Sequence, residues 1–502
     1  MQENKRSWFL ITKVTLLLVL IILYTIVRLY YLFGSPLQPF EQVCSVIFFL
    51  SEAFILFHSF FFFLDIVREH FPEAPYKEKV PGADASVAIL IPARHEPKDI
   101  IQNTLLTCTS LAYENKKVYL LDDSTIEKYK QEARELSESL GVELFTRSNN
   151  KGAKAGMINQ ALNVVKEKYV AIFDADQNPM PGFLDLVIPV LEADEKLAFM
   201  QTPQFYSNID ASPVAMAAHN QQAIFYEYIC VGKTMNKAMF CCGTNVVFRR
   251  TALEDVGRFV EDTVTEDMAT SLKLHANGWK SSFIHKAYTF GMAPEDLASY
   301  FTQQQRWSLG TSQIFRKLLK LFITDRKALT PSQWVEYFLS TTYYFIGLPY
   351  FFLTLGPVMY VFFNLRSFYI DQFAYALTFV PLFILSNIVF YQSMITKKYK
   401  LSNMFKVQML TMMSIPVYLV SSINGLFNLD KKGFRVTPKG GGRNVPFRSL
   451  WPQLLLFCIL LFSFFWGLSK LYYSWDPVLA INMFWIGFQS VLLSGIFHFN
   501  KK

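Results

Sequence analysis

Apolar residues are distributed unevenly along this 502-residue chain, with long apolar runs near both ends and a mixed composition between Asp65 and about Thr330. A helix needs about 20 apolar residues to cross the hydrocarbon core of a bilayer. Runs that approach or exceed this length occupy residues 14–33, 43–66, 334–365, 373–391, 404–429, 450–468 and 478–497. The pattern therefore predicts an integral membrane protein whose central domain lies outside the bilayer.

Basic residues predict the orientation of the spans, because Lys and Arg concentrate in cytoplasmic loops. Lys5, Arg6 and Lys13 precede the first run, whereas the loop 34–42 after it has neither Lys nor Arg. We therefore expect both termini and the central domain to be cytoplasmic, in a plasma or inner membrane.

The run 404–429 is an exception, because basic residues flank it on both sides. We expect it to lie in the membrane interface or to re-enter, interrupted by Pro416 and Gly425. An ordinary span is the alternative. Six spans remain if the interfacial interpretation holds.

In the central domain, short apolar runs alternate with helix-like stretches. The runs 87–92, 117–121, 169–173 and 197–201 are typical of buried strands, and the stretches 98–110, 126–140 and 152–167 are typical of helices. This alternation predicts an α/β fold with a mostly parallel sheet covered on both faces. Such sheets bind ligands at the carboxyl ends of their strands, where this chain places Asp122, Asp123, Asp174 and Asp176.

The composition and charge of the chain restrict the kinds of partner that we expect. The chain is 52% hydrophobic, contains 49 Phe and has a formal net charge of +8. Lys and Arg that face anionic lipid account for much of this charge, so we expect no nucleic-acid partner. Glu52, His58 and Glu336 lie in apolar runs, where they line a wet path or form hydrogen bonds between helices.

Asp174 and Asp176 follow the buried run 169–173 and share one face of an extended chain. Two carboxylates beside a diphosphate make a site for Mg²⁺ or Mn²⁺. Asp122 and Asp123 end another predicted strand and are candidates for binding the nucleotide, with a simple turn as the alternative.

Thr265-Glu266-Asp267 opens an amphipathic stretch. Asp267 is a candidate general base for an acceptor hydroxyl, and helix capping is the alternative. A further motif is Gln303-Gln304-Gln305-Arg306-Trp307. Its Arg is suited to donate two hydrogen bonds to diphosphate oxygens, and its Trp offers a ring face to a sugar. An amphipathic interfacial helix explains the same residues, and both interpretations can hold together.

These motifs, in this order, resemble those of the processive family 2 glycosyltransferases, which include cellulose, chitin and hyaluronan synthases. Further segments resemble the bacterial cellulose synthase catalytic subunit, at residues 91–97, 154–156, 201–205, 240–245 and 434–439. This resemblance implies a GT-A type domain. It implies nucleotide-sugar binding by Glu96, Asp122, Asp123, Lys154, Asp174, Asp176, Gln303, Arg306, Thr437 and Lys439, the last two in a gating-loop-like segment. It implies acceptor binding by Phe240, Cys242, Gly243, Glu266, Asp267 and Trp307.

The resemblance implies that the chain polymerises a UDP-sugar, UDP-glucose above all, into a β-linked polysaccharide such as cellulose and exports it through its own helices. A chitin- or hyaluronan-type synthase, a non-processive transferase that adds one sugar to a lipid or short glycan, and a nucleotide-sensing channel are the alternatives. The expected partners are the donor, the growing polysaccharide, membrane lipid, and an export partner or a second copy of the chain.

We expect six segments: two transmembrane helices (1–66), a glycosyltransferase domain (67–300), an interfacial helix (301–330), two transmembrane helices (331–396), an interfacial helix with the gating-loop-like segment (397–449) and two transmembrane helices (450–502). Two features depart from the bacterial cellulose enzymes. Fewer spans precede the catalytic domain, and Lys502 directly follows the last predicted span. We therefore expect no regulation through a C-terminal domain that binds cyclic di-GMP.

Overall fold

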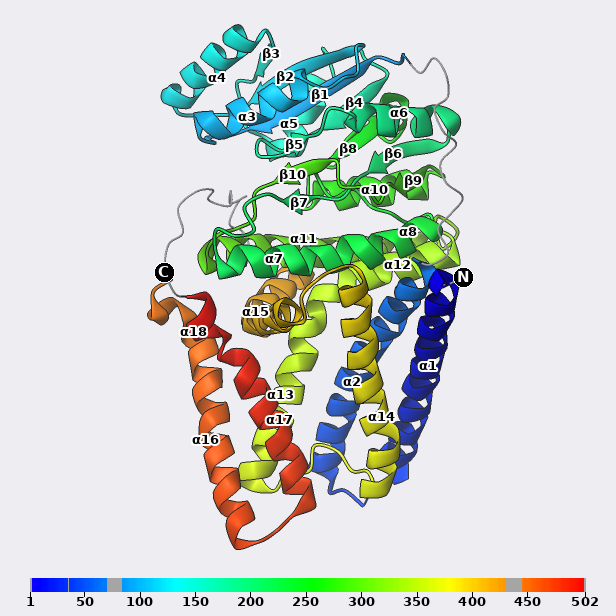
Figure 1. Cartoon of the computed structure of the whole chain (residues 1–502), viewed down its shortest axis with the longest axis vertical. Helices are drawn as coiled ribbons and strands as arrows, with labels where there is room; N and C mark the ends of the chain where they lie inside the picture. Colours follow the sequence, from blue (N-terminus) through cyan, green and yellow to red (C-terminus); the bar gives the residue numbers. More distant parts are fainter. Residues whose placement is uncertain (1, 35, 70–83, 430–444, 501–502) are drawn as a thin grey trace.

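A computed structural model describes residues 2–34, 36–69, 84–429 and 445–500. It consists of an α/β domain that stands on a layer of crosswise helices, with a bundle of upright helices beneath (Figure 1). The structure therefore contains both the globular central domain and the apolar helices that the sequence predicted.

The α/β domain is built on one seven-stranded sheet in the order β3-β2-β1-β4-β8-β6-β9. All neighbouring strands are parallel except β8, which is antiparallel to both β4 and β6. The predicted, mostly parallel sheet is thus confirmed. In the order of the sheet, the strands are β3 (Glu143–Thr146), β2 (Lys116–Asp122), β1 (Val87–Ala93), β4 (Tyr169–Ile172), β8 (Val246–Arg249), β6 (Leu197–Gln201) and β9 (Lys280–Phe283).

Helices cover both faces of this sheet. Along β1, Val87, Ile89 and Ile91 join one apolar cluster, and Ala88 and Leu90 join another, as the alternation of side chains in a strand requires. One cluster is closed by α3 (Lys98–Thr109), α4 (Glu127–Leu140) and α6 (Phe183–Ala193). The other is closed by α5 (Ala153–Ala161), α9 (Arg250–Asp255) and α10 (Glu266–Ala276).

A small second sheet and several crosswise helices connect the domain to the bundle (Figure 1). The sheet has the order β5-β10-β7, with β5 (Asn178–Pro179), β10 (Thr289–Gly291) and β7 (Phe205–Tyr206). Beneath it run the long helix α11 and a second crosswise helix formed by α7, η1 and α8 in succession (Figure 1). The connecting helices are α7 (Pro213–Ile224), the π-helix η1 (Phe225–Ile229), α8 (Cys230–Met235), α11 (Leu297–Thr324) and α12 (Pro331–Thr342).

In the described part of the chain, seven helical segments are long and apolar enough to cross a membrane, so the chain is an integral membrane protein. Six contain the upright helices of Figure 1: α1 (Gln2–Gly34), α2 (Pro39–Arg68), α13 (Gly347–Phe363), α14 (Gln372–Thr396), α16 (Trp451–Tyr473) and α17 (Pro477–Leu493). The seventh, α15 (Leu401–Phe427), lies beneath α11 and is seen almost end-on (Figure 1). Short helices η2 (Tyr343–Ile346), η3 (Phe447–Leu450) and α18 (Gly495–Phe499) complete the order.

The orientation of α15 bears on the expected interfacial helix. By length and composition α15 qualifies as a span, yet it lies crosswise to the other six (Figure 1). This direction favours the interface, and its position in a bilayer stays a prediction.

The ionisable groups predicted inside the apolar runs have partners on other helices. Glu52 on α2 accepts hydrogen bonds from Arg28 Nε (2.8 Å) and Tyr24 Oη (2.7 Å), both on α1. His58 Nε2 lies 3.1 Å from Thr342 Oγ1 of α12. For these two residues the structure favours hydrogen bonding between helices over the lining of a wet path.

Candidate functional site

The motifs predicted from the sequence meet in one pocket between the sheet and α11. Strand ends supply Glu96, Asp123, Asp174 and Asp176, and Lys154 comes from the first turn of α5. The opposite wall comes from the loop before β8, the start of α10 and the helix α11. It contains Cys242, Gly243, Glu266, Asp267, Gln303, Arg306 and Trp307. The pocket thus lies at the carboxyl ends of parallel strands, as expected.

Two predicted residues that the structure describes, Asp122 and Phe240, do not line this pocket. Asp122 is buried and accepts a hydrogen bond from the N–H of Ser124 (3.1 Å). Phe240 packs against the apolar cluster between α10 and α12. Thr437 and Lys439, the gating-loop-like residues, lie outside the described residues. The roles of all these residues stay predictions.

Asp123 is held by an arginine that the sequence did not single out. Arg147 donates from Nε to Asp123 Oδ1 (2.6 Å) and from Nη2 to Oδ2 (2.8 Å), with both side chains buried. The same guanidinium donates to the carbonyls of Lys151 and Ala153. Arg147 therefore joins the end of β2 to the turn that positions Lys154.

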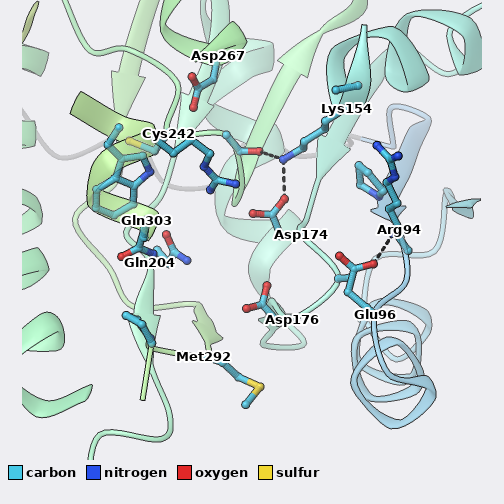
Figure 2. A pocket seen from close by; sticks show the side chains of 18 of the residues that line it. Arg94, Glu96, Lys154, Asp174, Asp176, Gln204, Cys242, Asp267, Met292 and Gln303 are labelled. Atoms are coloured by element: carbon cyan, nitrogen blue, oxygen red, sulfur yellow. Dashed lines mark hydrogen bonds and ion pairs between the residues drawn. The ribbon is translucent and has the colours of Figure 1, made fainter. Parts of the chain in front are cut away.

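Asp174 and Lys154 form an ion pair in the middle of the pocket (Figure 2). Lys154 Nζ donates to Asp174 Oδ1 at 2.5 Å and to the Gly243 carbonyl at 2.6 Å. The backbone N–H of Asp174 donates to Thr244 Oγ1 (2.9 Å). Burial alone would lower the pKa of Lys154, but Asp174 and Glu266 outweigh it and raise this pKa. The lysine therefore stays charged at neutral pH.

The donor set of the pocket fits a divalent cation that a diphosphate helps to hold. Asp174 and Asp176 both line the pocket, with their carboxylates turned toward the same space (Figure 2). Among the described residues, no group of three or more His, Cys, Asp or Glu side chains is placed to hold a metal alone. Two carboxylates suffice for Mg²⁺ or Mn²⁺ where phosphate oxygens and water complete the shell.

The loop from Phe240 to Asn245 is fixed from behind by buried amides. Gln201 Oε1 accepts from the N–H of Cys242 (2.9 Å), and Gln201 Nε2 donates to the Thr244 carbonyl (2.8 Å). Gly243 has φ +84°, a region that side chains disfavour. A Cβ added to Gly243 would lie 2.9 Å from Asp267 Oδ2. The loop therefore brings bare backbone directly against Asp267.

Asp267 is placed by the first turn of α10. Its Oδ1 accepts from the N–H of Met268 (2.7 Å), and its side chain faces the pocket (Figure 2). Burial, followed by repulsion from Glu266, raises the pKa of Asp267 to about 7. Burial also raises the pKa of Glu266. A carboxylate with a pKa near neutrality is suited to accept a proton from a hydroxyl and to release it afterwards.

Helix α11 presents Gln303, Arg306 and Trp307 to the pocket because residues three and four apart share a helix face. Gln304 lies elsewhere on the helix, is buried, and accepts from Tyr418 Oη (3.0 Å) of α15. Trp307 packs at the edge of an apolar cluster that contains Tyr344 and Tyr418. The side of the pocket that α11 forms therefore borders the helical bundle.

Several further residues line the pocket although no sequence motif predicted a role for them. Arg94 and Gln204 lie in the segments 91–97 and 201–205, which carry part of the resemblance, and Asp296 caps α11 by accepting from the N–H of Ser299 (2.8 Å). An acid two residues after a Pro and just before an amphipathic helix was a capping signal. Met292 and Glu295 also line the pocket, without such a signal.

Comparisons with known proteins agree with this geometry. Residues 83–310 match the family described as glycosyltransferase like family 2, and residues 254–404 match the cellulose synthase family. The α/β domain therefore belongs to the family 2 glycosyltransferases. The match to the cellulose synthase family runs from the end of α9 to the start of α15.

Two curated relatives align with most of the chain. The cellulose synthase catalytic subunit [UDP-forming] of Pseudomonas fluorescens is 30% identical over 427 residues, which are 82% of this chain and 56% of the relative. The cellulose synthase 1 catalytic subunit [UDP-forming] of Komagataeibacter xylinus is 25% identical over 477 residues, 92% of this chain and 62% of the relative. The chain thus spans less than two thirds of either relative.

Among solved structures, a mannosyltransferase of Pyrobaculum calidifontis in complex with GDP-Man and Mn²⁺ is similar in fold, with a TM-score of 0.56. The similarity covers 77% of this chain and all of that chain, at 17% identity. It agrees with the GT-A type fold expected for the domain.

Proposed function

We propose that the protein is a membrane-embedded, inverting, processive glycosyltransferase that extends a β-linked polysaccharide from a UDP-sugar, with UDP-glucose as the preferred donor. One observation carries the proposal. A single pocket collects the acids of two strand ends, Lys154, the carboxylate of Asp267, and the Arg306–Trp307 pair. The similarity to UDP-forming cellulose synthase subunits supports the choice of donor and polymer.

In this proposal the donor lies along the strand ends. Asp174 and Asp176 hold Mg²⁺ or Mn²⁺, which neutralises the diphosphate leaving group when bound. Lys154 and Arg306 contribute positive charge to the same diphosphate, and Gln303 adds a polar contact. Glu96 and Asp123 border the nucleotide.

Asp267 acts as the general base. An acceptor hydroxyl attacks the anomeric carbon, the bond from that carbon to the phosphate oxygen breaks, and the hydroxyl proton passes to Asp267. UDP leaves with the electron pair of the broken bond. A single displacement inverts the anomeric configuration. Trp307 offers its ring to the acceptor sugar, and the loop of Cys242 and Gly243 borders it.

The upright helices give the product a route away from the site. In the proposed orientation the catalytic domain and both termini are cytoplasmic, where nucleotide sugars are made, and the polymer leaves through the helices beneath Trp307. Helix α15 lies in the interface, in keeping with its crosswise direction (Figure 1). An export partner or a second copy of the chain completes the path.

The test is incorporation of labelled sugar by the purified protein in lipid vesicles, with UDP-glucose, UDP-N-acetylglucosamine and GDP-mannose offered in parallel with Mg²⁺ or Mn²⁺. We expect a long polymer from UDP-glucose that a β-glucan-specific glycosidase digests. A polymer from another donor would correct the sugar. A single added sugar would establish the non-processive alternative.

Asp267→Asn tests the mechanism. We expect transfer to fall by about 10²–10⁴-fold, the range that a general base contributes, with UDP affinity nearly unchanged. The matched control is Asp262→Asn, because Asp262 is exposed and pairs with Lys317 on the surface. Normal turnover in Asp267→Asn would refute the assignment of the base.

A further inference from the structure

Helix α12, which joins α11 to the upright helix α13, carries a buried acid that no part of the proposed chemistry uses. Glu336 Oε2 lies 3.0 Å from Lys233 Nζ, and each side chain is only 2% exposed. Glu336 Oε1 accepts from Asn236 Nδ2 (2.6 Å), and Lys233 also donates to Ser340 Oγ (2.6 Å). A buried acid with this many partners holds its neighbours in one arrangement.

The partners of Glu336 lead directly into the acceptor loop. Lys233 and Asn236 lie at the end of α8, and Gln333 Nε2 of α12 donates to the carbonyl of the next residue, Lys237 (2.7 Å). The ammonium of Lys233 lies 5.6 Å from the centroid of the Phe240 ring. Two residues further, Cys242 lines the pocket. Helix α12 therefore anchors the loop at its origin.

The next residue of α12 anchors the helix of the base. Tyr337 Oη lies 2.7 Å from Nδ1 of His275, near the end of α10. Ser281 Oγ donates its proton to the Met239 carbonyl (2.6 Å), so it accepts from His275 Nε2 (2.8 Å). Nδ1 then accepts the hydrogen bond of Tyr337. Burial lowers the pKa of His275 to about 3, so this neutral arrangement persists at working pH.

We propose that Glu336 and Tyr337 are positioning residues that set the distance between the acceptor loop and Asp267. The inference rests on the proposed function, because it gives α12 a task in the same transfer reaction. The loop and the base come from separate segments, and both are tied to adjacent residues of one helix. A displacement of about 1 Å between reacting groups costs roughly 10²-fold in rate.

The first test separates acceptor use from donor binding. Tyr337→Phe removes one hydroxyl without a change of shape, and Tyr343→Phe, at an exposed tyrosine nearby, is its control. Glu336→Gln, with the exposed Glu138→Gln as its control, tests the other anchor. With UDP-glucose as donor and a cello-oligosaccharide as acceptor, we expect roughly a tenfold higher KM for the acceptor or a matching loss of kcat. The Kd for UDP should change less than about twofold.

Two results would overturn the proposal. One is an unchanged acceptor KM and kcat in both variants. The other is a loss of UDP affinity that parallels the loss of activity, because a general loosening of the fold would weaken donor binding and turnover together. Glu336→Asp, which keeps the charge, should recover part of the activity lost in Glu336→Gln; equal loss in both would also count against positioning.

The second test needs no sugar transfer, so it separates this inference from the proposed function. Maleimide labelling can report on Cys242, the cysteine that lines the pocket, once the other accessible thiols are removed. We therefore replace Cys44 and Cys458 by Ser; Cys108, Cys230 and Cys241 are buried. Loss of one anchoring hydrogen bond should speed maleimide labelling of Cys242 by roughly fivefold in Tyr337→Phe. Labelling at the rate of the Tyr343→Phe control would overturn the proposal even if the enzyme makes polymer.

Discussion

Lys154 and Asp174 form an ion pair of 2.5 Å between Nζ and Oδ1 in the centre of the pocket, and the same ammonium lies 2.6 Å from the Gly243 carbonyl. A carboxylate proposed to hold the metal is therefore paired with a lysine. If Asp174 holds the metal as proposed, the metal and the lysine compete for this carboxylate, and a bound diphosphate offers the lysine another partner. We therefore expect the binding of metal and the binding of nucleotide to be interdependent.

Lys154→Gln should therefore strengthen binding of Mn²⁺ to the nucleotide-free protein by about tenfold, since a hydrogen bond to a charged group contributes about 1.5–3 kcal/mol. The same change should weaken UDP binding. The free Mn²⁺ signal in electron paramagnetic resonance measures the first effect. Lys151→Gln, at an exposed lysine in the same turn, is the control. Equal Mn²⁺ affinity in wild type and Lys154→Gln would contradict the competition.

Gly243→Ala should reduce transfer by about 10²-fold. The new methyl group would lie 2.9 Å from Asp267 Oδ2, so the carboxylate must move away from the acceptor. The φ of +84° adds strain of about 1–3 kcal/mol. Turnover and thermal unfolding of the purified variant measure the two effects separately.

Gly278→Ala is the matched control for Gly243→Ala. Gly278 has φ +80°, but a Cβ there meets open space. We therefore expect a similar loss of stability and a nearly normal rate. A similar loss of turnover in both variants would mean that strain, rather than contact with Asp267, causes the effect.

The fold could be predicted where the chain has continuous apolar runs between turns. Strand β6 matches its predicted bounds, β1 and β4 differ from theirs by one residue at one end, and β2 extends one residue further at both ends. Strand β8, with only four residues, was missed, and no local pattern indicates that it runs antiparallel to its neighbours. Helix α5 ends at Ala161 rather than near residue 167. The direction of a strand within a sheet and the end of a helix depend on tertiary contacts, which a local sequence pattern does not contain.

The site could be predicted to the extent that local geometry determines it. The spacing of Gln303, Arg306 and Trp307 places them on one helix face in any context. For Asp122 and Asp123 the sequence left the choice open, since neighbours in a strand point to opposite sides. The structure turns Asp123 to the pocket. Contacts between distant segments, such as Arg147 with Asp123 or Tyr337 with His275, have no local signal.

The pH dependence should follow Asp267, whose pKa burial and Glu266 raise to about 7. A base must be ionised, so kcat/KM should fall about tenfold per pH unit below 7. The unfolded pKa is about 3.9, so the folded state binds more protons between about pH 4 and 7. Ionisation of Asp267 therefore lowers stability as the pH rises through this window.

Asp267→Asn tests the sign of this effect, because asparagine does not ionise. The melting temperature of the variant relative to wild type should rise from pH 5 to pH 8. A constant difference across this range would show that another group controls the acid limb of the rate profile.

Arg147→Met should destabilise the domain by about 3–5 kcal/mol, because it leaves the buried Asp123 carboxylate without its cation. Arg147→Lys keeps the charge but loses the two-pronged contact, so we expect an intermediate loss. The exposed Arg134, 3.6 Å from Glu127, is the control, and Arg134→Met should cost less than about 1 kcal/mol. Unfolding in detergent, followed by tryptophan fluorescence, measures all three. Since Arg147 also holds the turn before Lys154, UDP affinity should fall with stability in both Arg147 variants, and normal UDP affinity in Arg147→Met would contradict this role.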